Sequence, residues 1–469
     1  MINLYADQES SLKEILRKFR QRFKAALLVA PCGYGKTIVF SAIAKRAKDK
    51  GNRVLICVHR QELLRQTCLT LKKFDVSYGI IASGYEMKPH EKVQVASIQT
   101  LCRRIKIPIQ RRGGNKVDGV VLPPTLLIID EAHHAIAPTF QKVISHFDCK
   151  VLGVTATPWR SNGEGLNKIF DCMIIGGTAD ELINQGRLCR PIYYAPPQQV
   201  DLEGVKISMG DFDKVEISKR VNKPTVTGDA IEHYKRICPE KRAVVFCVSR
   251  KHADDVAVQF NLAGVPAASI DGSLSDRDRF QRIKDLKNGY IKVLTSCELI
   301  SEGFDLPTIE AAIMLRPTKS LAIYIQQAGR ALRTAEGKQN AIILDHVGNC
   351  FRFGAIEQIN DWSLEGLSKK TKEKENLPIV RRCKMCFAIL SMSAKRCHLC
   401  NSEPEISERE LKYIEGQLQA IEKEKLKIDQ QKERKSAWTL DALIALGIKR
   451  GMKNPHGWAW HVMNGRKRA

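Results

Sequence analysis

The sequence feature that most constrains the fold is the segment at residues 30–37, which reads A-P-C-G-Y-G-K-T. It follows an apolar run at residues 25–29 and precedes a largely apolar run at residues 38–45, which predicts a buried strand, a loop of small residues and a helix. Successive backbone N–H groups at a helix start form a concave site for anions. We therefore expect the loop to cradle a phosphate group. The alternative, a chance match in a glycine-containing turn, is disfavoured by the strand–loop–helix setting.

Each residue type in this loop suits nucleotide binding. Gly33 and Gly35 let the backbone approach phosphate oxygens without a Cβ in the way. Lys36 is expected to reach the β- and γ-phosphates, and the Thr37 hydroxyl to ligate Mg²⁺. Ala30 departs from the pattern, because it stands where the motif has its first glycine. The predicted nucleotide-binding residues of the loop are Cys32, Gly33, Tyr34, Gly35, Lys36 and Thr37.

Two adjacent carboxylates follow the apolar run at residues 126–129. In doubly wound sheets ligands bind at the carboxyl ends of the strands. We expect Asp130 to hold Mg²⁺, directly or through water, and Glu131 to orient the attacking water. The alternative is an ordinary acidic turn. The position of the pair after a phosphate loop favours the catalytic interpretation over this alternative.

Strand-like and helical stretches alternate in two series. The first series has helical spacing at residues 11–24 and 61–74, and the second at 251–260. The strand-like runs are residues 25–29, 54–58, 93–96, 126–129 and 151–154, and then 243–248, 292–295, 311–315 and 341–344. This alternation predicts two parallel sheets, each covered on both faces. Residues 196–226 lack periodicity and are expected to be an irregular connector.

The stretch at residues 326–333 reads Q-Q-A-G-R-A-L-R and has a helical period. Gln326, Gly329, Arg330 and Arg333 share one face of that helix. A glycine inside a helix costs about 1 kcal/mol relative to alanine, so we expect another segment to pack closely against Gly329. The two arginines could reach the γ-phosphate held by the other domain and stabilise transition-state charge. Taken alone, such a pair is usually a solvated helix face.

Four cysteines are grouped, unlike the others of the chain. Cys383 and Cys386, then Cys397 and Cys400, form two C-x₂-C pairs separated by ten residues. Two such pairs can present four thiolates to one tetrahedral ion, which predicts a closed structural zinc site. The spacing is shorter than the common gap of about 15–20 residues. A disulfide pair and a redox pair are weaker alternatives, and His398 is expected to be solvated.

The chain carries a net charge of +25, which predicts attraction to a polyanion. Nucleic acid is the first candidate and an anionic membrane surface the second. No apolar run approaches the roughly 20 residues of a membrane span. Of the two candidates we expect nucleic acid as the partner and no membrane. The first residues lack the signature of a signal peptide, and fifteen cysteines then indicate a reducing compartment. The basic loop at residues 103–116 could track phosphates or be a solvated insertion.

Residues 404–435 are nearly all charged or helix-forming and predict a long surface helix or a short helical hairpin. The tail at residues 436–469 has six basic residues against one acidic residue and interleaved tryptophans. It could bind a nucleic-acid strand by phosphate contact and stacking, or pack its tryptophans into a small helical module.

The phosphate loop, D-E-A-H at residues 130–133 and T-A-T-P at residues 155–158, in this order, resemble the N-terminal motor domain of a superfamily 2 DEAD/DEAH-box helicase. The resemblance implies an α/β fold of two tandem RecA-like doubly wound domains, with ATP bound between them. It also implies residue roles. Gln8 would contact adenine, Gly303 and Asp305 would lie at the nucleotide between the domains, and the nucleic-acid backbone would be contacted by Arg60, Ser97 and Thr100. The catalytic residues would be Lys36, Asp130, Glu131, Arg330 and Arg333. The residues that couple hydrolysis to movement would be His133, Thr155, Thr157 and Gln326.

Residues 315–330 and 343–349, with the cysteine ribbon after them, look most like the bacterial RadD-type DNA-repair helicases and related phage proteins. We therefore expect a DNA helicase or translocase, cytoplasmic in a bacterial or phage-infected cell, with ATP, Mg²⁺ and structural Zn²⁺. The alternatives are a duplex translocase or restriction-system motor, and a nucleic-acid-binding module that uses ATP as a ligand. The ribbon and tail are also candidate surfaces for protein partners. The expected divisions are 1–190 and 227–365 for the motor domains, 191–226 for the connector, 380–403 for the zinc ribbon, 404–435 for the charged helix and 436–469 for the helical basic tail.

Overall fold

The computed structural model divides the chain into two compact units, residues 1–403 and 404–469. The described residues are 3–105, 121–159, 163–196, 200, 202–208, 210–222, 224–297, 306–358, 362–366, 380–391, 394–403, 439–449, 454–457 and 459–460. Gly303, Asp305, the basic residues at 111–116 and the predicted helix at 404–435 lie outside this set. Within it, no helix combines the length and apolar character that crossing a membrane requires.

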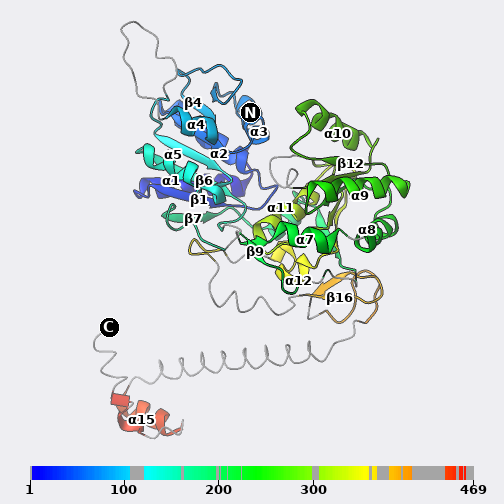
Figure 1. Ribbon diagram of the computed structural model, residues 1–469. Coiled ribbons are helices and arrows are strands. Elements are labelled where there is room, and N and C mark those ends of the chain that lie inside the picture. The colour runs from blue at the N-terminus through cyan, green and yellow to red at the C-terminus, as the bar shows by residue number, and fades with distance from the viewer. Residues whose placement is uncertain are drawn as a thin grey trace. The chain divides into compact units, whose positions relative to one another are not determined.

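The first lobe, residues 6–184, is built on a sheet covered by helices (Figure 1). The sheet has seven strands in the order β3-β4-β2-β5-β6-β1-β7, with every neighbouring pair parallel. This confirms the first predicted sheet. Its strands are β1 (Ala25–Val29), β2 (Val54–Val58), β3 (Gly79–Ile81), β4 (Val93–Ser97), β5 (Leu126–Asp130), β6 (Lys150–Thr155) and β7 (Cys172–Ile175). Its helices are α1 (Ala6–Arg20), α2 (Lys36–Asp49), α3 (Gln61–Lys73), α4 (Ile98–Arg104), α5 (Pro138–His146) and α6 (Ala179–Asn184), with a 3₁₀ turn at Ala132–His134.

Both faces of the first sheet are covered, which explains its near-continuous apolar strands. In β1, Leu28 packs into a core with residues of α1 and α2, such as Leu12 and Ile43. The neighbouring Leu27 points the other way, into a second core that contains Phe140 of α5. Alternate side chains of a strand face opposite sides of a sheet, so a strand buried on both faces must be apolar throughout.

The second lobe, residues 188–358, has a sheet of six parallel strands in the order β12-β13-β11-β14-β15-β8. This confirms the second predicted sheet. Its strands are β8 (Arg190–Tyr194), β11 (Ala243–Phe246), β12 (Ala267–Ile270), β13 (Val293–Ser296), β14 (Ala311–Met314) and β15 (Asn340–Asp345). Its helices are α7 (Lys214–Val221), α8 (Pro224–Ile237), α9 (Arg250–Leu262), α10 (Asp276–Asn288), α11 (Leu321–Ala331) and α12 (Asn349–Phe353), with a 3₁₀ turn at Ile356–Gln358.

The structure differs from the expected irregular connector at residues 191–226. This segment supplies most of β8, the antiparallel pair β9 (Ile207–Ser208) and β10 (Asp211–Phe212), and helix α7. Polar contacts that no periodicity reveals hold it in place. The Asp211 carboxylate accepts hydrogen bonds from Thr318 Oγ1 at 3.0 Å and from the Lys319 backbone N–H at 2.8 Å. The connector is therefore part of the second lobe.

The cysteine-bearing segment forms a small antiparallel pair, β16 (Val380–Arg382) and β17 (Ile389–Ser391). It is attached to the end of β8, because the Ala195 N–H donates to the Phe387 carbonyl at 3.0 Å and Arg382 Nη1 donates to the Pro196 carbonyl at 3.1 Å. The second unit contains α15 (Leu440–Lys449).

Candidate active site between two lobes and a cysteine cluster

The phosphate loop joins β1 to α2, and both of its glycines have a backbone conformation that favours glycine. Gly33 and Gly35 have φ angles of 85° and 89°. A Cβ at Gly33 would lie 2.5 Å from Leu188 Cδ2, and one at Gly35 would lie 2.6 Å from Gln8 Nε2. Ala30, in contrast, is not among the described residues with positive φ, so its side chain is compatible with the loop.

Lys36 and Asp130 approach the same point from neighbouring elements. Lys36 begins α2, and its Nζ donates to the carbonyl oxygens of Ala30 and Pro31 at 2.9 and 3.2 Å. Asp130 ends β5 and is only 4% exposed. Burial raises the pKa of Asp130 to about 7, with the Glu131 carboxylate adding to this effect and Lys36 opposing it. A divalent cation would stabilise the ionised carboxylate, so the site suits the predicted Mg²⁺.

Glu131 has an uncommon backbone conformation for a non-glycine residue, with φ 51° and ψ 54°. Residues held in this region cost about 1–3 kcal/mol and cluster at functional sites. Its N–H donates to Asp130 Oδ1 at 2.9 Å, and its Oε2 lies 3.3 Å from His133 Nδ1. This uncommon conformation therefore supports a functional role for Glu131.

Three of the predicted coupling residues form a connected chain with Glu131. His133 Nδ1 lies 3.1 Å from Thr155 Oγ1, and the Thr155 hydroxyl donates to the Thr157 carbonyl at 2.9 Å. The Thr155 hydroxyl therefore links the His133 ring to the backbone of Thr157. Their role in coupling stays a prediction.

The predicted nucleic-acid residues lie together at the carboxyl ends of β2 and β4 in the first sheet. Arg60 caps α3 after β2, and Ser97 ends β4, which pairs with β2 so that Ser97 faces Val58. Gln99 Nε2 donates to the His59 carbonyl at 3.3 Å and ties the two loops together, with Thr100 in the same turn of α4. The His59 ring lies 4.5 Å from that of His134, and the His133 and His134 rings lie 4.1 Å apart. Three neighbouring, mutually tilted imidazole rings thus connect these residues to the Glu131 carboxylate.

Helix α11 of the second lobe packs against the phosphate loop of the first. A Cβ at Gly329 would lie 3.1 Å from Cys32 Cβ and 3.3 Å from Cys32 Sγ. This confirms the prediction that another segment packs closely there. Arg330 and Gln326 are buried on the same helix. Burial lowers the pKa of the Arg333 guanidinium, and the nearby Cys32 thiol opposes the shift. Gly329 and Arg333 therefore approach the phosphate loop at Cys32.

Gln8 lies against the same loop but is only 3% exposed. Its Oε1 accepts from the Tyr5 N–H at 3.0 Å, and its Nε2 donates to the Tyr34 carbonyl at 2.7 Å. In this structure Gln8 stabilises the loop through the Tyr34 carbonyl. Its contact with adenine stays a prediction.

Sequence reasoning missed two groups beside this site, Arg187 and a tryptophan pair. Trp159 Nε1 donates to the Ser363 carbonyl at 2.6 Å, and its ring lies 5.1 Å from that of Trp362. Trp362 lines a small pocket together with Cys32 and Gly329. These contacts join residues about 200 positions apart, such as Trp159 and Ser363, so no local pattern could reveal them.

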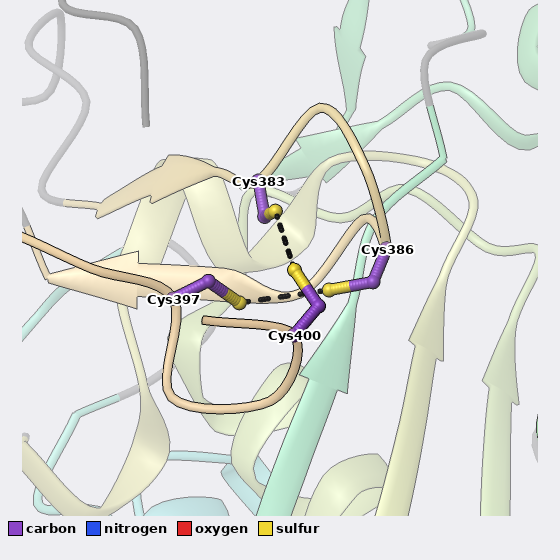
Figure 2. A group of neighbouring side chains, drawn as sticks. All are labelled: Cys383, Cys386, Cys397 and Cys400. Carbon is purple, nitrogen blue, oxygen red and sulfur yellow. Dashed lines mark hydrogen bonds between the residues drawn. The ribbon is translucent and has the colours of Figure 1, made fainter. Parts of the chain in front are cut away.

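The four grouped cysteines converge at the end of the β16–β17 pair (Figure 2). Their Sγ atoms all lie within 4.8 Å of one another, with Cys383 and Cys400 at 3.5 Å and Cys386 and Cys397 at 3.6 Å. A bonded disulfide needs about 2.05 Å, whereas thiolates around one tetrahedral zinc ion lie about 3.8 Å apart, given Zn–S distances of about 2.3 Å. The spacing therefore suits the metal and not a disulfide.

Both C-x₂-C segments have the same backbone geometry, which supports a common ligand. Phe387 and Asn401 have positive φ angles of 65° and 58°. Their N–H groups donate to the carbonyls of Cys383 and Cys397 at 3.0 and 2.9 Å. The N–H groups of Cys383 and Cys397 in turn donate to the carbonyls of Ala388 and Ser402, each at 2.8 Å. His398 is exposed and is not part of the cluster.

Protein purified under reducing conditions is expected to contain one zinc ion per chain by elemental analysis. Cys386→Ser should lose the metal and lower the thermal midpoint, because a structural zinc site contributes folding free energy directly. Cys149→Ser, a half-buried cysteine of the first lobe, should keep the zinc. Metal-free wild-type protein that unfolds at the same temperature would rule out a structural zinc site.

Two family models match the chain. Residues 1–160 match the model described as "Type III restriction enzyme, res subunit" and residues 229–335 match "Helicase conserved C-terminal domain". A 51.5 kDa protein of a Lactococcus phage is 35% identical over 413 residues, covering 87% of this chain and 85% of that protein. The Saccharomyces cerevisiae protein IRC3, whose name proposes an ATP-dependent helicase, is 29% identical over 361 residues, covering 73% of this chain and 51% of that protein. The chain thus spans about half the length of IRC3.

Solved structures share the fold at low sequence identity. An ATP-dependent type ISP restriction–modification enzyme, LlaBIII, bound to DNA is 19% identical with a TM-score of 0.55, over 74% of this chain and 28% of that one. A fragment assigned to the HsdR subunit of a type I restriction enzyme from Vibrio vulnificus is 20% identical with a TM-score of 0.57, over 77% of this chain and 69% of that one. Both parallel sheets correspond to tandem RecA-like domains.

Proposed function

The chain belongs to superfamily 2 of the helicases, and on this premise we propose that it hydrolyses ATP to move along DNA and separate its strands. Members of this superfamily are ATP-dependent nucleic-acid motors. The observation that carries the proposal is the contact of Gly329 with Cys32, because it brings helix α11, which carries Arg330, to the phosphate loop of the other lobe.

The residue types of the phosphate loop, the carboxylate pair and the two arginines suit phosphoryl transfer to water. Lys36 would bind the β- and γ-phosphates, and Glu131 would orient the attacking water and accept its proton. Thr37 and Asp130 would hold Mg²⁺, which supplies positive charge to the phosphates when bound. Arg330 and Arg333 would stabilise the charge that develops on the transferred phosphoryl group.

Movement along a strand would follow from closure and opening of the two lobes. The proposed strand-binding site of the first lobe is formed by Arg60, Ser97 and Thr100. The neighbouring histidine rings connect it to the carboxylates. If each lobe binds the strand, changes at the phosphate loop shift one strand-binding site relative to the other. Net movement requires that the affinity of each site for the strand alternates with the nucleotide state.

DNA is the nucleic acid that we propose as the track, with a role in repair, recombination or replication. The net charge of +25 supports a polyanion but does not distinguish DNA from RNA. The structural neighbour that is bound to DNA supports DNA. Preference for one nucleic acid is therefore the first property to measure.

A second candidate is translocation on duplex DNA without strand separation, as the motor of a restriction system. The restriction-type family model at residues 1–160 and both restriction-enzyme neighbours favour it. A strand-displacement assay separates the candidates, because a duplex translocase displaces a bound protein or third strand but leaves the duplex paired.

The test is ATP turnover by the full chain with single-stranded DNA, duplex DNA or RNA of equal length. We expect strong stimulation by DNA that falls steeply as salt rises, because phosphate contacts release counterions. Stimulation by RNA alone would refute the DNA assignment. Nucleotide binding without turnover on any polymer would instead indicate a binding module that uses ATP as a ligand.

A further inference from the structure

Arg187, which belongs to none of the motifs, reaches the phosphate loop from outside. It lies between α6 and β8, where the chain passes from the first lobe to the second. Its Nη2 donates to the Tyr34 carbonyl at 2.7 Å, and its Nη1 donates to Asp7 Oδ2 at 2.7 Å. Its side chain is 9% exposed, and its guanidinium lies 4.1 Å from the centre of the Tyr5 ring. Arg187 is therefore held on three sides.

The carbonyl that Arg187 binds lies in the most adaptable part of the loop. Tyr34 stands between Gly33 and Gly35, which have the widest choice of backbone conformation. The Tyr34 carbonyl accepts hydrogen bonds from two side chains, Arg187 and Gln8, each at 2.7 Å. Contacts from outside the loop thus select one orientation of this peptide.

Fixing this carbonyl also fixes an N–H group. The Tyr34–Gly35 peptide is trans, so its C=O and N–H point in opposite directions. Because the carbonyl faces Arg187 and Gln8, the Gly35 N–H faces the opposite side of the loop. That N–H directly precedes Lys36 at the start of α2, where backbone donors bind phosphate oxygens.

The residues next to Arg187 contact the end of residues 326–333 of the second lobe, here called the arginine segment. The Cys189 N–H donates to the Leu332 carbonyl at 2.7 Å, and Leu188 pairs with Arg333 in an antiparallel bridge. Three consecutive residues therefore touch the phosphate loop on one side and the end of the arginine segment on the other.

We propose that Arg187 is a positioning residue for nucleotide binding, which holds the Tyr34–Gly35 peptide so that the Gly35 N–H is presented to the phosphates of ATP. Asp7 orients the guanidinium for this task. The inference rests on the proposed function for the identity of the nucleotide. Since the N–H contacts a phosphate before and during the reaction, its loss weakens binding more than turnover, and KM rises while kcat is largely kept.

The experiment compares Arg187→Gln and Arg187→Lys with wild-type protein, by Mg-ADP titration calorimetry and by ATP turnover. We expect Arg187→Gln to weaken Mg-ADP binding and raise KM for ATP about tenfold, the effect of one charge-assisted hydrogen bond. The lysine variant should recover part of the affinity, because a single ammonium group does not reproduce the two-pronged contact of a guanidinium. The matched control is Arg46→Gln, which removes another arginine–carboxylate pair to α1, with Glu9 at 3.1 Å. It should match wild type.

Unchanged Mg-ADP affinity in Arg187→Gln, or a fall in kcat with KM unchanged, would overturn the proposal. Should Arg187→Gln not fold, Asp7→Asn tests the same point, since it keeps the donors but removes the carboxylate that orients them. It should weaken binding about threefold, by analogy with the loss of one weaker hydrogen bond, at an unchanged thermal midpoint, and unchanged affinity refutes the role. A wild-type chain that binds Mg-ADP but never turns over ATP would refute the proposed function, while the effect of Arg187 on Mg-ADP binding would still stand.

Discussion

Lys36→Ala is expected to lower the rate of DNA-stimulated ATP hydrolysis by about 10²–10³, the loss that follows removal of one preorganised charge-stabilising donor. The Lys36 ammonium group already lies over the loop, bonded to the Ala30 and Pro31 carbonyls. Phosphate oxygens would take over these donor bonds, so the variant should lose both nucleotide affinity and turnover. The measurement is initial ATP turnover at saturating DNA, with nucleotide binding followed by calorimetry.

The matched control for this change is Lys45→Ala, on the same helix. Lys45 lies 3.6 Å from Asp49 in a pair near the surface, and such pairs contribute little. Both variants should unfold at nearly the wild-type temperature, because neither empties the core. If Lys36→Ala keeps most of the wild-type turnover, the loop does not bind the reacting phosphates, and the assignment of the ATP site is wrong.

Substitution of either predicted catalytic arginine should act on the reaction and not on binding. Arg330→Gln and Arg333→Gln are each expected to lower kcat roughly 10³-fold, the lower end of the effect of such arginines in phosphoryl transfer. Nucleotide affinity should change little, because the charge that they stabilise develops in the transition state. Single-turnover hydrolysis at saturating ATP, paired with Mg-ADP binding, separates the two effects.

Arg250→Gln serves as the control for the arginine variants. It removes an exposed arginine at the start of α9 in the same lobe, and should leave turnover at the wild-type level. Equal losses of affinity and turnover in Arg333→Gln would show that Arg333 acts in ground-state binding. Full activity of both arginine variants would mean that the two lobes do not share one ATP site.

The strand elements were largely predictable because their signal is local. The apolar runs at residues 25–29 and 54–58 coincide with β1 and β2. A strand buried on both faces has no polar alternation, and its neighbours in sequence are helices with a clear 3.6-residue period. The two parallel sheets followed from counting these units.

The connector was not predictable in the same way. β8 spans only Arg190–Tyr194 and is a strand because β15 offers it a parallel edge, with Tyr193 opposite Ile343. β15 lies about 150 residues further along the chain, so the pairing depends on a sheet that the segment itself does not encode. The same reasoning applies to Asp211, whose partners lie in the loop after β14.

The motif residues could be identified from the sequence, whereas their support could not. The order of the loop, the carboxylate pair and the arginine helix predicted which groups would gather, and the Gly329 contact with Cys32 agrees with it. The αL conformation of Glu131, the tryptophan pair and the Arg187 contact with the Tyr34 carbonyl had no local signal. Each depends on a partner brought close by folding.

By itself, the sequence determined the strand–loop–helix order, the two series of buried strands and the four cysteines that can hold one metal ion. These follow from short-range rules, namely hydrophobic period, glycine at tight turns and ligand spacing. The tertiary structure alone decided which lobe takes the connector, how Glu131 is turned and which side chains hold the phosphate loop. The reason is physical, since these outcomes depend on contacts between residues far apart in the chain, and such contacts exist only after both sheets have formed.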